Sequence, residues 1–138
     1  MPKYRIIVNP VSGRGAGEKS IPALRRYLES QGMDYELLRT ERPGHAIELA
    51  QKAIGAGWDT VIGVGGDGTA NEIINGLMLA QGGASMGMLA VGRGNDFAFG
   101  VGIPKGLEAG CRVLSDGYRK KIDVGRVVGG DYPEGRYF

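Results

Sequence analysis

Short apolar runs of strand-forming residues alternate along this chain with segments in which apolar residues recur at helical spacing. This alternation predicts an α/β fold: a Rossmann-like, three-layer domain with a mostly parallel sheet covered by helices on both sides. The strands are expected over residues 4–8, 35–39, 60–64 and 86–91, and the helices around 24–28 and over 46–53, 69–79 and 105–114. Ligands of such sheets bind beyond the carboxyl ends of the strands, so the turns that follow the strands should meet at one edge.

The end of the chain has a different pattern. Residues 121–127 alternate polar and apolar side chains, which predicts a strand, and Gly129-Gly130-Asp131 predicts a hairpin turn before Arg136-Tyr137-Phe138. We therefore expect one domain over residues 1–123 and the start of a truncated second β domain over residues 124–138.

Composition and charge exclude several classes of protein. The formal net charge of +2 at pH 7 is too small for the clustered basic surface that binds nucleic acid. The single cysteine, Cys111, excludes an internal disulfide framework and is expected in the core. One cysteine and one histidine cannot form a zinc cluster, and the histidine, His45, is expected to be solvated.

No targeting or membrane segment is expected. The apolar run after Lys3 and Arg5 is too short for a secretory signal. The uncharged stretch over residues 73–92 is interrupted by polar residues and by the Gly82-Gly83 pair, so it does not predict a membrane span. These features favour a cytoplasmic protein.

Glycine makes up 26 of the 138 residues, and the glycines gather at the ends of the apolar runs. The sharpest motif is Gly65-Gly66-Asp67-Gly68-Thr69-Ala70-Asn71-Glu72, which follows the third predicted strand and precedes a helix. Glycines let backbone N–H groups approach phosphate oxygens closely, and the helix N-terminus adds partial positive charge. The motif therefore predicts an anion-binding turn, although it matches neither the Walker P-loop nor the dinucleotide fingerprint.

Some residues of this motif also have simpler interpretations. Thr69 and Glu72 match a capping box, in which the hydroxyl and the carboxylate satisfy the first N–H groups of the helix. Capping does not require Asp67, whose carboxylate would repel phosphates unless a cation or a proton lay between them. We favour a magnesium-linked or catalytic role for Asp67 over that of a simple turn aspartate.

Two further turns contribute candidates. In the turn after the fourth predicted strand, the Arg93 guanidinium is suited to bind phosphate oxygens bidentately. Asn95 and Asp96 either cap a short helix or face the phosphates. The turn Asn9-Pro10-Val11-Ser12-Gly13 and the residue Thr40 are weak signals alone, and they gain weight because the fold places them at the same edge.

The chain resembles the diacylglycerol kinase catalytic-domain family in four motifs, which occur in the family's order. They are Asn9-Pro10-x-Ser12-Gly13, Thr40 with Pro43-Gly44-His45-Ala46, Gly65-Gly66-Asp67-Gly68-Thr69-x-Asn71-Glu72, and Gly94-Asn95-Asp96-Phe97-Ala98. Lys121-Ile122-Asp123-Val124-Gly125 is similar to the family's crossing into its second domain. The glycine-rich core also resembles, more distantly, sphingosine kinases, NAD kinases and phosphofructokinases. Arg93 and Val91 depart from the pattern, since the family usually has Thr and Pro there.

The resemblance implies the N-terminal half of a two-domain lipid kinase, with ATP as phosphoryl donor and Mg²⁺ as cofactor. The implied acceptor is a lipid hydroxyl at the membrane surface, such as that of diacylglycerol or a sphingoid base, bound with the help of a missing β-sandwich domain. The fragment alone is therefore expected to be inactive. Asp67 is the expected catalytic residue, and the metal ligands stay unassigned. The expected nucleotide-binding residues are Asn9, Pro10, Ser12, Gly13, Thr40, Gly65, Gly66, Asp67, Gly68, Thr69, Ala70, Asn71, Glu72, Arg93, Asn95 and Asp96.

Two alternatives stay open. An NAD kinase shares Gly-Gly-Asp-Gly-Thr but should lack the Asn9-Pro10-x-Ser12-Gly13 opening. A non-catalytic nucleotide-binding module is favoured by the short chain. Peripheral attachment to the membrane and pairing of two copies are further open expectations.

Overall fold

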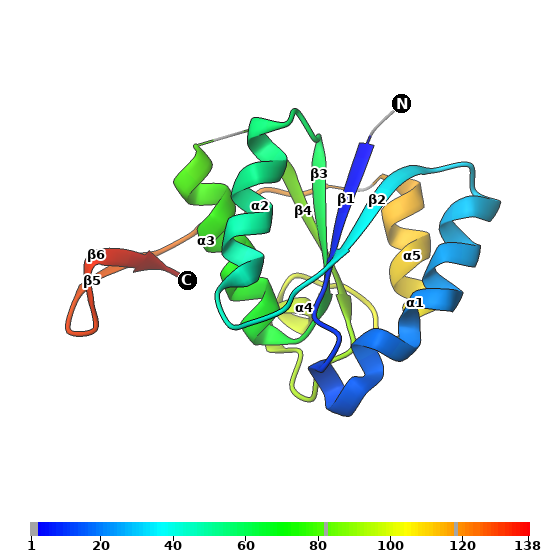
Figure 1. The fold of residues 1–138 in the computed structure, drawn as a ribbon, viewed down its shortest axis with the longest axis horizontal. Coiled ribbons are helices and arrows are strands. Elements are labelled where there is room, and N and C mark those ends of the chain that lie inside the picture. The colour runs from blue at the N-terminus through cyan, green and yellow to red at the C-terminus, as the bar shows by residue number, and fades with distance from the viewer. Residues whose placement is uncertain (1–2, 82, 118) are drawn as a thin grey trace.

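Four parallel strands form the central sheet (Figure 1). The computed structural model of the chain describes residues 3–81, 83–117 and 119–138. The strands are β1 (Lys3–Val8), β2 (Asp34–Arg39), β3 (Thr60–Gly65) and β4 (Ser85–Ala90), in the order β2-β1-β3-β4. They lie where the apolar runs predict them, and the expectation of a mostly parallel sheet is confirmed.

Five helices accompany the strands in the described part of the chain. They are α1 (Ser12–Ser30), α2 (His45–Gly55), α3 (Asp67–Ala80), α4 (Asp96–Gly100) and α5 (Leu107–Asp116). Four of them match the predicted helices, and α4 is the short helix that was one interpretation of Asn95 and Asp96. The helices lie on both faces of the sheet, which completes the predicted three-layer α/β domain (Figure 1).

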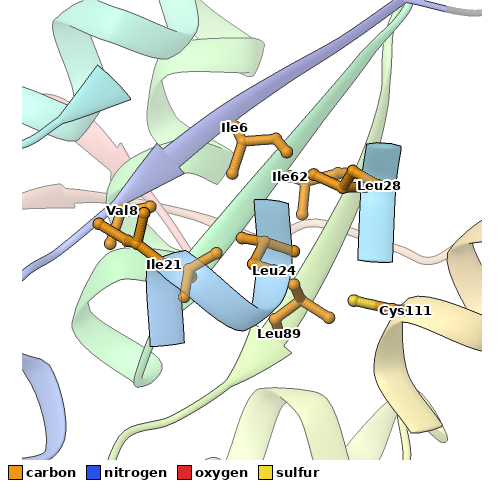
Figure 2. Packing of buried hydrophobic residues seen from close by; sticks show 9 residues of the cluster. Ile6, Val8, Ile21, Leu24, Leu28, Ile62, Leu89 and Cys111 are labelled. Carbon is orange, nitrogen blue, oxygen red and sulfur yellow. The ribbon is translucent and has the colours of Figure 1, made fainter. Parts of the chain in front are cut away.

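One face of the sheet packs against α1 and α5. Successive strand residues point to opposite faces, so Ile6 and Ile62 share this face with Leu24 of α1 (Figure 2). Cys111 of α5 lies in the same cluster, as its position in the sequence predicts, and is 1% exposed. Burial raises the pKa of the Cys111 thiol to about 11.

The other face packs against α2 and α3. Ile7 and Val61 lie in this second core with Ala50 of α2 and Ile73 of α3. The two helices approach closely because their contact surface carries small residues: a Cβ added at Gly76 would lie 2.4 Å from the backbone oxygen of Ile47. This packing fixes α3, whose N-terminus follows β3 directly.

The predicted hairpin forms, but two predicted boundaries are wrong. β5 (Arg126–Gly129) and β6 (Tyr132–Tyr137) pair in an antiparallel hairpin that lies against α3, whereas residues 121–125 form no strand. The helix α3 begins at Asp67, two residues before the predicted start, with Gly66 as its N-cap. Thr69 therefore lies inside the first helical turn, and the predicted capping box does not form because Gly66 occupies the cap position.

Candidate functional site

The turns after β1, β2 and β3 meet at the carboxyl edge of the sheet, as predicted. Backbone hydrogen bonds continue the strand ladder into these turns. The N–H of Thr40 donates to the carbonyl of Val8 at 2.8 Å, and the N–H of Asn9 donates to the carbonyl of Val64 at 2.9 Å. The first residues of the turns are thus held in register with one another.

A cleft of about 300 Å³ opens between these turns and the start of α3. Its walls come from four separate parts of the chain: the turn after β1, the turn after β2, the beginning of α2 and the first turns of α3. The lining residues are Asn9, Pro10, Val11, Thr40, Glu41, Arg42, Pro43, Ala46, Thr69 and Glu72. Five of the predicted nucleotide-binding residues, Asn9, Pro10, Thr40, Thr69 and Glu72, are therefore brought together around one cavity.

The glycine-rich turns pack backbone against backbone. A Cβ added at Gly92 would lie 2.4 Å from the Cα of Gly66, so the turns after β3 and β4 touch where neither has a side chain. A Cβ at Gly13 would lie 2.0 Å from the carbonyl oxygen of Val91, which brings the turn after β1 against the same place. Ser12 is also near, with its Oγ 3.7 Å from a Cβ built at Gly66. These glycines are needed for the turns to fit together.

Gly68 differs from the other glycines of the motif. It is exposed on the first turn of α3, and a Cβ added there would meet no atom within 4 Å. The fold therefore gives no steric reason for glycine at this position. An open face at a helix N-terminus is where backbone N–H groups receive an anion.

The helix α1 is kinked near its start by a left-handed turn. Gly13, Arg14 and Gly15 have φ values of 60°, 59° and 93°. Glycine adopts this conformation readily, but Arg14 does so at a cost. Beyond this turn, a Cβ added at Gly17 would lie 2.0 Å from the carbonyl oxygen of Asn9, so α1 is drawn tightly against the turn after β1.

The carboxylate of Asp67 has a structural role that the sequence did not predict. Its Oδ2 accepts the backbone N–H of Asp96 at 3.0 Å, and its Oδ1 accepts that of Phe97 at 2.9 Å. Asp67 thereby satisfies the first two N–H groups of α4 and ties this helix to the start of α3. The expectation of a catalytic or magnesium-linked role stays a prediction, and any such role must coexist with these two bonds.

Asn95 and Arg93 lie outside the cleft lining. The side chain of Asn95, a residue in the left-handed region with φ of 57°, is bonded at both ends to Gly92: Oδ1 accepts the Gly92 N–H at 3.0 Å and Nδ2 donates to its carbonyl at 2.8 Å. Asn95 precedes α4, but its side chain does not cap that helix, since Asp67 does. Arg93 and Asp96 are exposed beside this turn.

Asn71 faces the hairpin. Its Nδ2 donates to the carbonyl of Tyr137 at 3.1 Å, and its Oδ1 accepts the Nη2 of Arg136 at 2.8 Å. Neither the hairpin contact nor the second asparagine involved, Asn75, is visible in the motif, because the contacting residues are more than 60 positions apart.

The wall formed by the turn after β2 carries charged residues that the prediction missed. Glu41 and Arg42 follow the predicted site residue Thr40 directly. That adjacency in the sequence could have indicated that they line the same cleft. The Nδ1 of half-buried His45 accepts the Glu41 N–H at 2.9 Å, so His45 shapes this wall and is less solvated than predicted. Arg42 pairs with Glu48 at 2.8 Å, and this hydrogen bond lowers the pKa of Glu48 and raises that of Arg42.

A second ion pair lies next to the cleft residue Thr40. Arg39, the last residue of β2, donates through Nε and Nη2 to the two carboxylate oxygens of Glu18 at 2.9 and 3.0 Å. The hydrogen bond from Arg39 holds the pKa of Glu18 below its usual range. The pair links the sheet edge to the start of α1.

Carboxylate, imidazole and thiol groups are the side chains that bind metal ions in proteins. Within residues 3–81, 83–117 and 119–138, no group of three or more His, Cys, Asp or Glu side chains is arranged to hold a metal ion.

Comparisons with known proteins agree with this geometry. The model of the diacylglycerol kinase catalytic domain matches residues 3–127. The chain belongs to this family. The diacylglycerol kinases of Staphylococcus saprophyticus and Staphylococcus haemolyticus are 31% and 32% identical to it over 125 and 123 residues, which are 91% and 89% of this chain. These matches cover only 41% and 37% of the two relatives, so the chain spans about two fifths of their length.

A solved diacylglycerol kinase structure has a similar fold. The crystal structure of a diacylglycerol kinase from Bacillus anthracis superposes with a TM-score of 0.76 at 26% sequence identity, over 91% of this chain and 44% of that one. The four-stranded sheet and its helices thus correspond to one part of a longer kinase. In the described residues, no helix has the length and apolar character that crossing a membrane requires.

A larger hollow elsewhere does not compete with the cleft. It measures about 610 Å³ and is lined by residues that include Trp58, Asp59 and Arg119. These lie near the starts of β3 and β4, at the amino end of the sheet. Ligands of parallel α/β domains bind at the opposite, carboxyl end.

Proposed function

We propose that this chain is the ATP-binding part of a lipid kinase that transfers the γ-phosphoryl group of ATP to a lipid hydroxyl, such as that of diacylglycerol or a sphingoid base. The observation that carries the proposal is the cleft itself. It lies at the N-terminus of α3, and family-motif residues from two turns and from α3, Asn9, Thr40 and Glu72 among them, line it. Membership in the diacylglycerol kinase catalytic domain family supports the reaction class.

The residues of the site have distinct parts in this proposal. The open first turn of α3, around Gly68, would receive the phosphates on its backbone N–H groups. Asn9, Thr40 and Glu72 would offer amide, hydroxyl and carboxylate groups to the rest of the nucleotide. Mg²⁺, when bound, would neutralise charge on the transferred phosphoryl group.

The reaction needs little covalent chemistry from the protein. The oxygen of the lipid hydroxyl would form a bond to the γ-phosphorus, the bond from that phosphorus to the bridging oxygen of ADP would break, and the hydroxyl proton would be released. Catalysis of this kind depends on positioning and charge stabilisation. We propose that the chain alone binds ATP without turnover, since the lipid would be held at the membrane surface by a further domain.

Calorimetric titration of the chain with ATP, with and without Mg²⁺, tests the nucleotide part of the proposal. We expect saturable binding to one site, weakened by Thr40→Ala and by Glu72→Gln and unchanged in the control Gln51→Ala, an exposed amide on α2. Absence of ATP binding, or preferential binding of NAD, would contradict the proposal. Phosphorylation of diacylglycerol or sphingoid base in vesicles by this chain alone would contradict the expected inactivity.

A further inference from the structure

The hairpin β5–β6 has no share in the two hydrophobic cores. Its strand β5, which includes Val128, is exposed along its whole length, and Tyr132 at the start of β6 is exposed as well. The strand β6 lies against α3, and the hairpin otherwise extends away from the helices (Figure 1). In the described residues, every side-chain hydrogen bond from the hairpin to another element goes to α3.

The hydrogen-bond pattern of the hairpin leaves the peptide groups of Tyr137 pointing outward. Gly125 and Phe138 exchange two backbone hydrogen bonds, of 2.9 and 3.0 Å. In an antiparallel pair, neighbouring residues alternate between facing the partner strand and facing away from it. The N–H and C=O of Tyr137 therefore lie on the outer edge of β6, where unpaired strand groups normally need protection.

Asn75 of α3 takes the place of a partner strand at this edge. Its Oδ1 accepts the N–H of Tyr137 at 2.8 Å, and its Nδ2 donates to the carbonyl of Tyr137 at 3.1 Å. Asn75 is only 4% exposed, and its Nδ2 also donates to the carbonyl of Asn71 at 2.8 Å. A buried amide destabilises a fold unless its donors and acceptors are satisfied, and β6 satisfies this one.

Asn71 adds a second connection one helical turn away. Besides its bond to the carbonyl of Tyr137, it accepts the guanidinium of Arg136 through Nε at 3.3 Å and Nη2 at 2.8 Å. The same guanidinium lies 5.6 Å from the centre of the Tyr132 ring, in a cation–π contact within β6. Main chain and side chain of β6 are thus both bound to α3.

We propose that Asn71 and Asn75, the asparagine pair, are positioning residues that fix the hairpin relative to the phosphate-binding end of α3. Asn71 lies four residues beyond Asp67, which is about 6 Å along the helix at 1.5 Å per residue. This short stretch of α3 is rigid and joins the hairpin contact at Asn71 to the first turn of the helix. The docked hairpin and the first turn of α3 therefore form one unit. The coupling of this unit to nucleotide binding rests on the proposed function.

Hydrogen exchange measured by NMR on the 138-residue chain tests the docking without any nucleotide. Asn75→Ala should raise exchange of the Tyr137 amide at least tenfold, which is about 1.4 kcal/mol of opening free energy, and leave the core amides of β1 and β3 protected. Asn75→Asp keeps an acceptor for the Tyr137 N–H but sets an oxygen against the carbonyls of Tyr137 and Asn71, so it should raise this exchange as well. Gln51→Ala is the matched amide control and should change nothing at the hairpin.

The outcomes separate the docking from the folding of the chain. Unchanged exchange at Tyr137 in Asn75→Ala would overturn the proposal. If Asn75→Ala unfolds the chain, the test passes to Asn71→Ala, because Asn71 is less buried than Asn75. This substitution removes the bonds to Tyr137 and Arg136 and should raise amide exchange in the hairpin while the core stays folded. Equal exchange in Asn71→Ala and the wild type would then be the refuting result.

A second measurement tests the coupling to the site. ATP with Mg²⁺ should slow exchange of the Tyr137 amide in the wild type, and this slowing should be lost in Asn75→Asp although ATP still binds. A purely structural contact would give no dependence on ATP, and that result would limit the asparagine pair to docking and overturn its positioning role. Failure of the wild type to bind ATP would contradict the proposed function and leave the docking result standing.

Discussion

Gly68→Ala is the substitution that best separates the demands of the fold from those of the ligand. Gly68 lies in the first turn of α3, is exposed, and has no atom within 4 Å of an added Cβ. Replacing glycine by alanine inside a helix stabilises it by up to about 1 kcal/mol. We therefore expect the free energy of unfolding of Gly68→Ala to be equal to that of the wild type or up to about 1 kcal/mol higher.

Nucleotide binding should change in the opposite direction. A methyl group on the open face of the turn would occupy the space that a phosphate oxygen needs next to the backbone N–H groups. We expect ATP affinity to fall at least tenfold, equivalent to about 1.4 kcal/mol. A variant that is more stable and binds more weakly is the signature of a glycine kept for its ligand.

Gly92→Ala is the matched contrast, because here the fold itself requires glycine. Its Cβ would lie 2.4 Å from the Cα of Gly66, about 1 Å short of an ordinary carbon–carbon contact. The two nearest atoms, the Cα and the N of Gly66, belong to the backbone and cannot rotate away. The two turns would therefore have to separate, at a cost of about 1–3 kcal/mol in stability. Gly100→Ala, whose Cβ would meet nothing within 4 Å, serves as the neutral control.

Urea unfolding, followed by tryptophan fluorescence, gives the free energy of unfolding of each variant. Calorimetric titration gives its affinity for ATP. The reasoning is refuted if Gly68→Ala binds ATP like the wild type, since the first turn of α3 would then not receive the phosphates. A loss of stability in Gly68→Ala would contradict the described geometry. Wild-type stability in Gly92→Ala would mean that the turns do not depend on the close contact.

Three further predictions concern stability. Arg14→Gly should stabilise the chain by about 1 kcal/mol in urea unfolding, because it relieves a left-handed conformation with φ of 59°. Glu18→Gln should be less stable than the wild type near neutral pH. This difference should disappear as the pH falls through the lowered pKa of Glu18, below its ordinary value of 4.5, because protonation then removes the bond to Arg39 in the wild type. Cys111, with a pKa of about 11, should resist iodoacetamide at pH 8 until the chain unfolds.

The fold could be predicted because its signals are local and repeated. Each strand is a short apolar run, and each is followed by helical periodicity, so the layers and the parallel sheet follow from the pattern alone. The helix α3 shows the limit. Thr69 and Glu72 have the spacing of a capping box, but the helix starts at Asp67 because Gly66 already lies in the extended conformation of a cap. A capping pattern does not distinguish between adjacent starts.

Only the part of the site that is built from the ends of neighbouring strands could be predicted from the sequence. The topology brings Asn9, Thr40 and Thr69 to one cleft, because consecutive turns of a parallel sheet share an edge. The partners of Asp67 and Asn71 lie about 30 and 65 residues further along the chain. Contacts at such separations depend on how helices and hairpin dock, and no periodicity in the sequence records them.

Asp67 illustrates why a motif residue is a poor test of a motif's function. Both of its carboxylate oxygens hold α4, so Asp67→Ala would release that helix together with the adjoining turn of Asn95. Loss of nucleotide binding in such a variant would follow equally from a missing catalytic group and from a displaced turn. A Cβ added at Gly68, one residue later, would contact no other part of the fold. Because its replacement leaves every described contact in place, a change in ATP binding there can be assigned to the ligand.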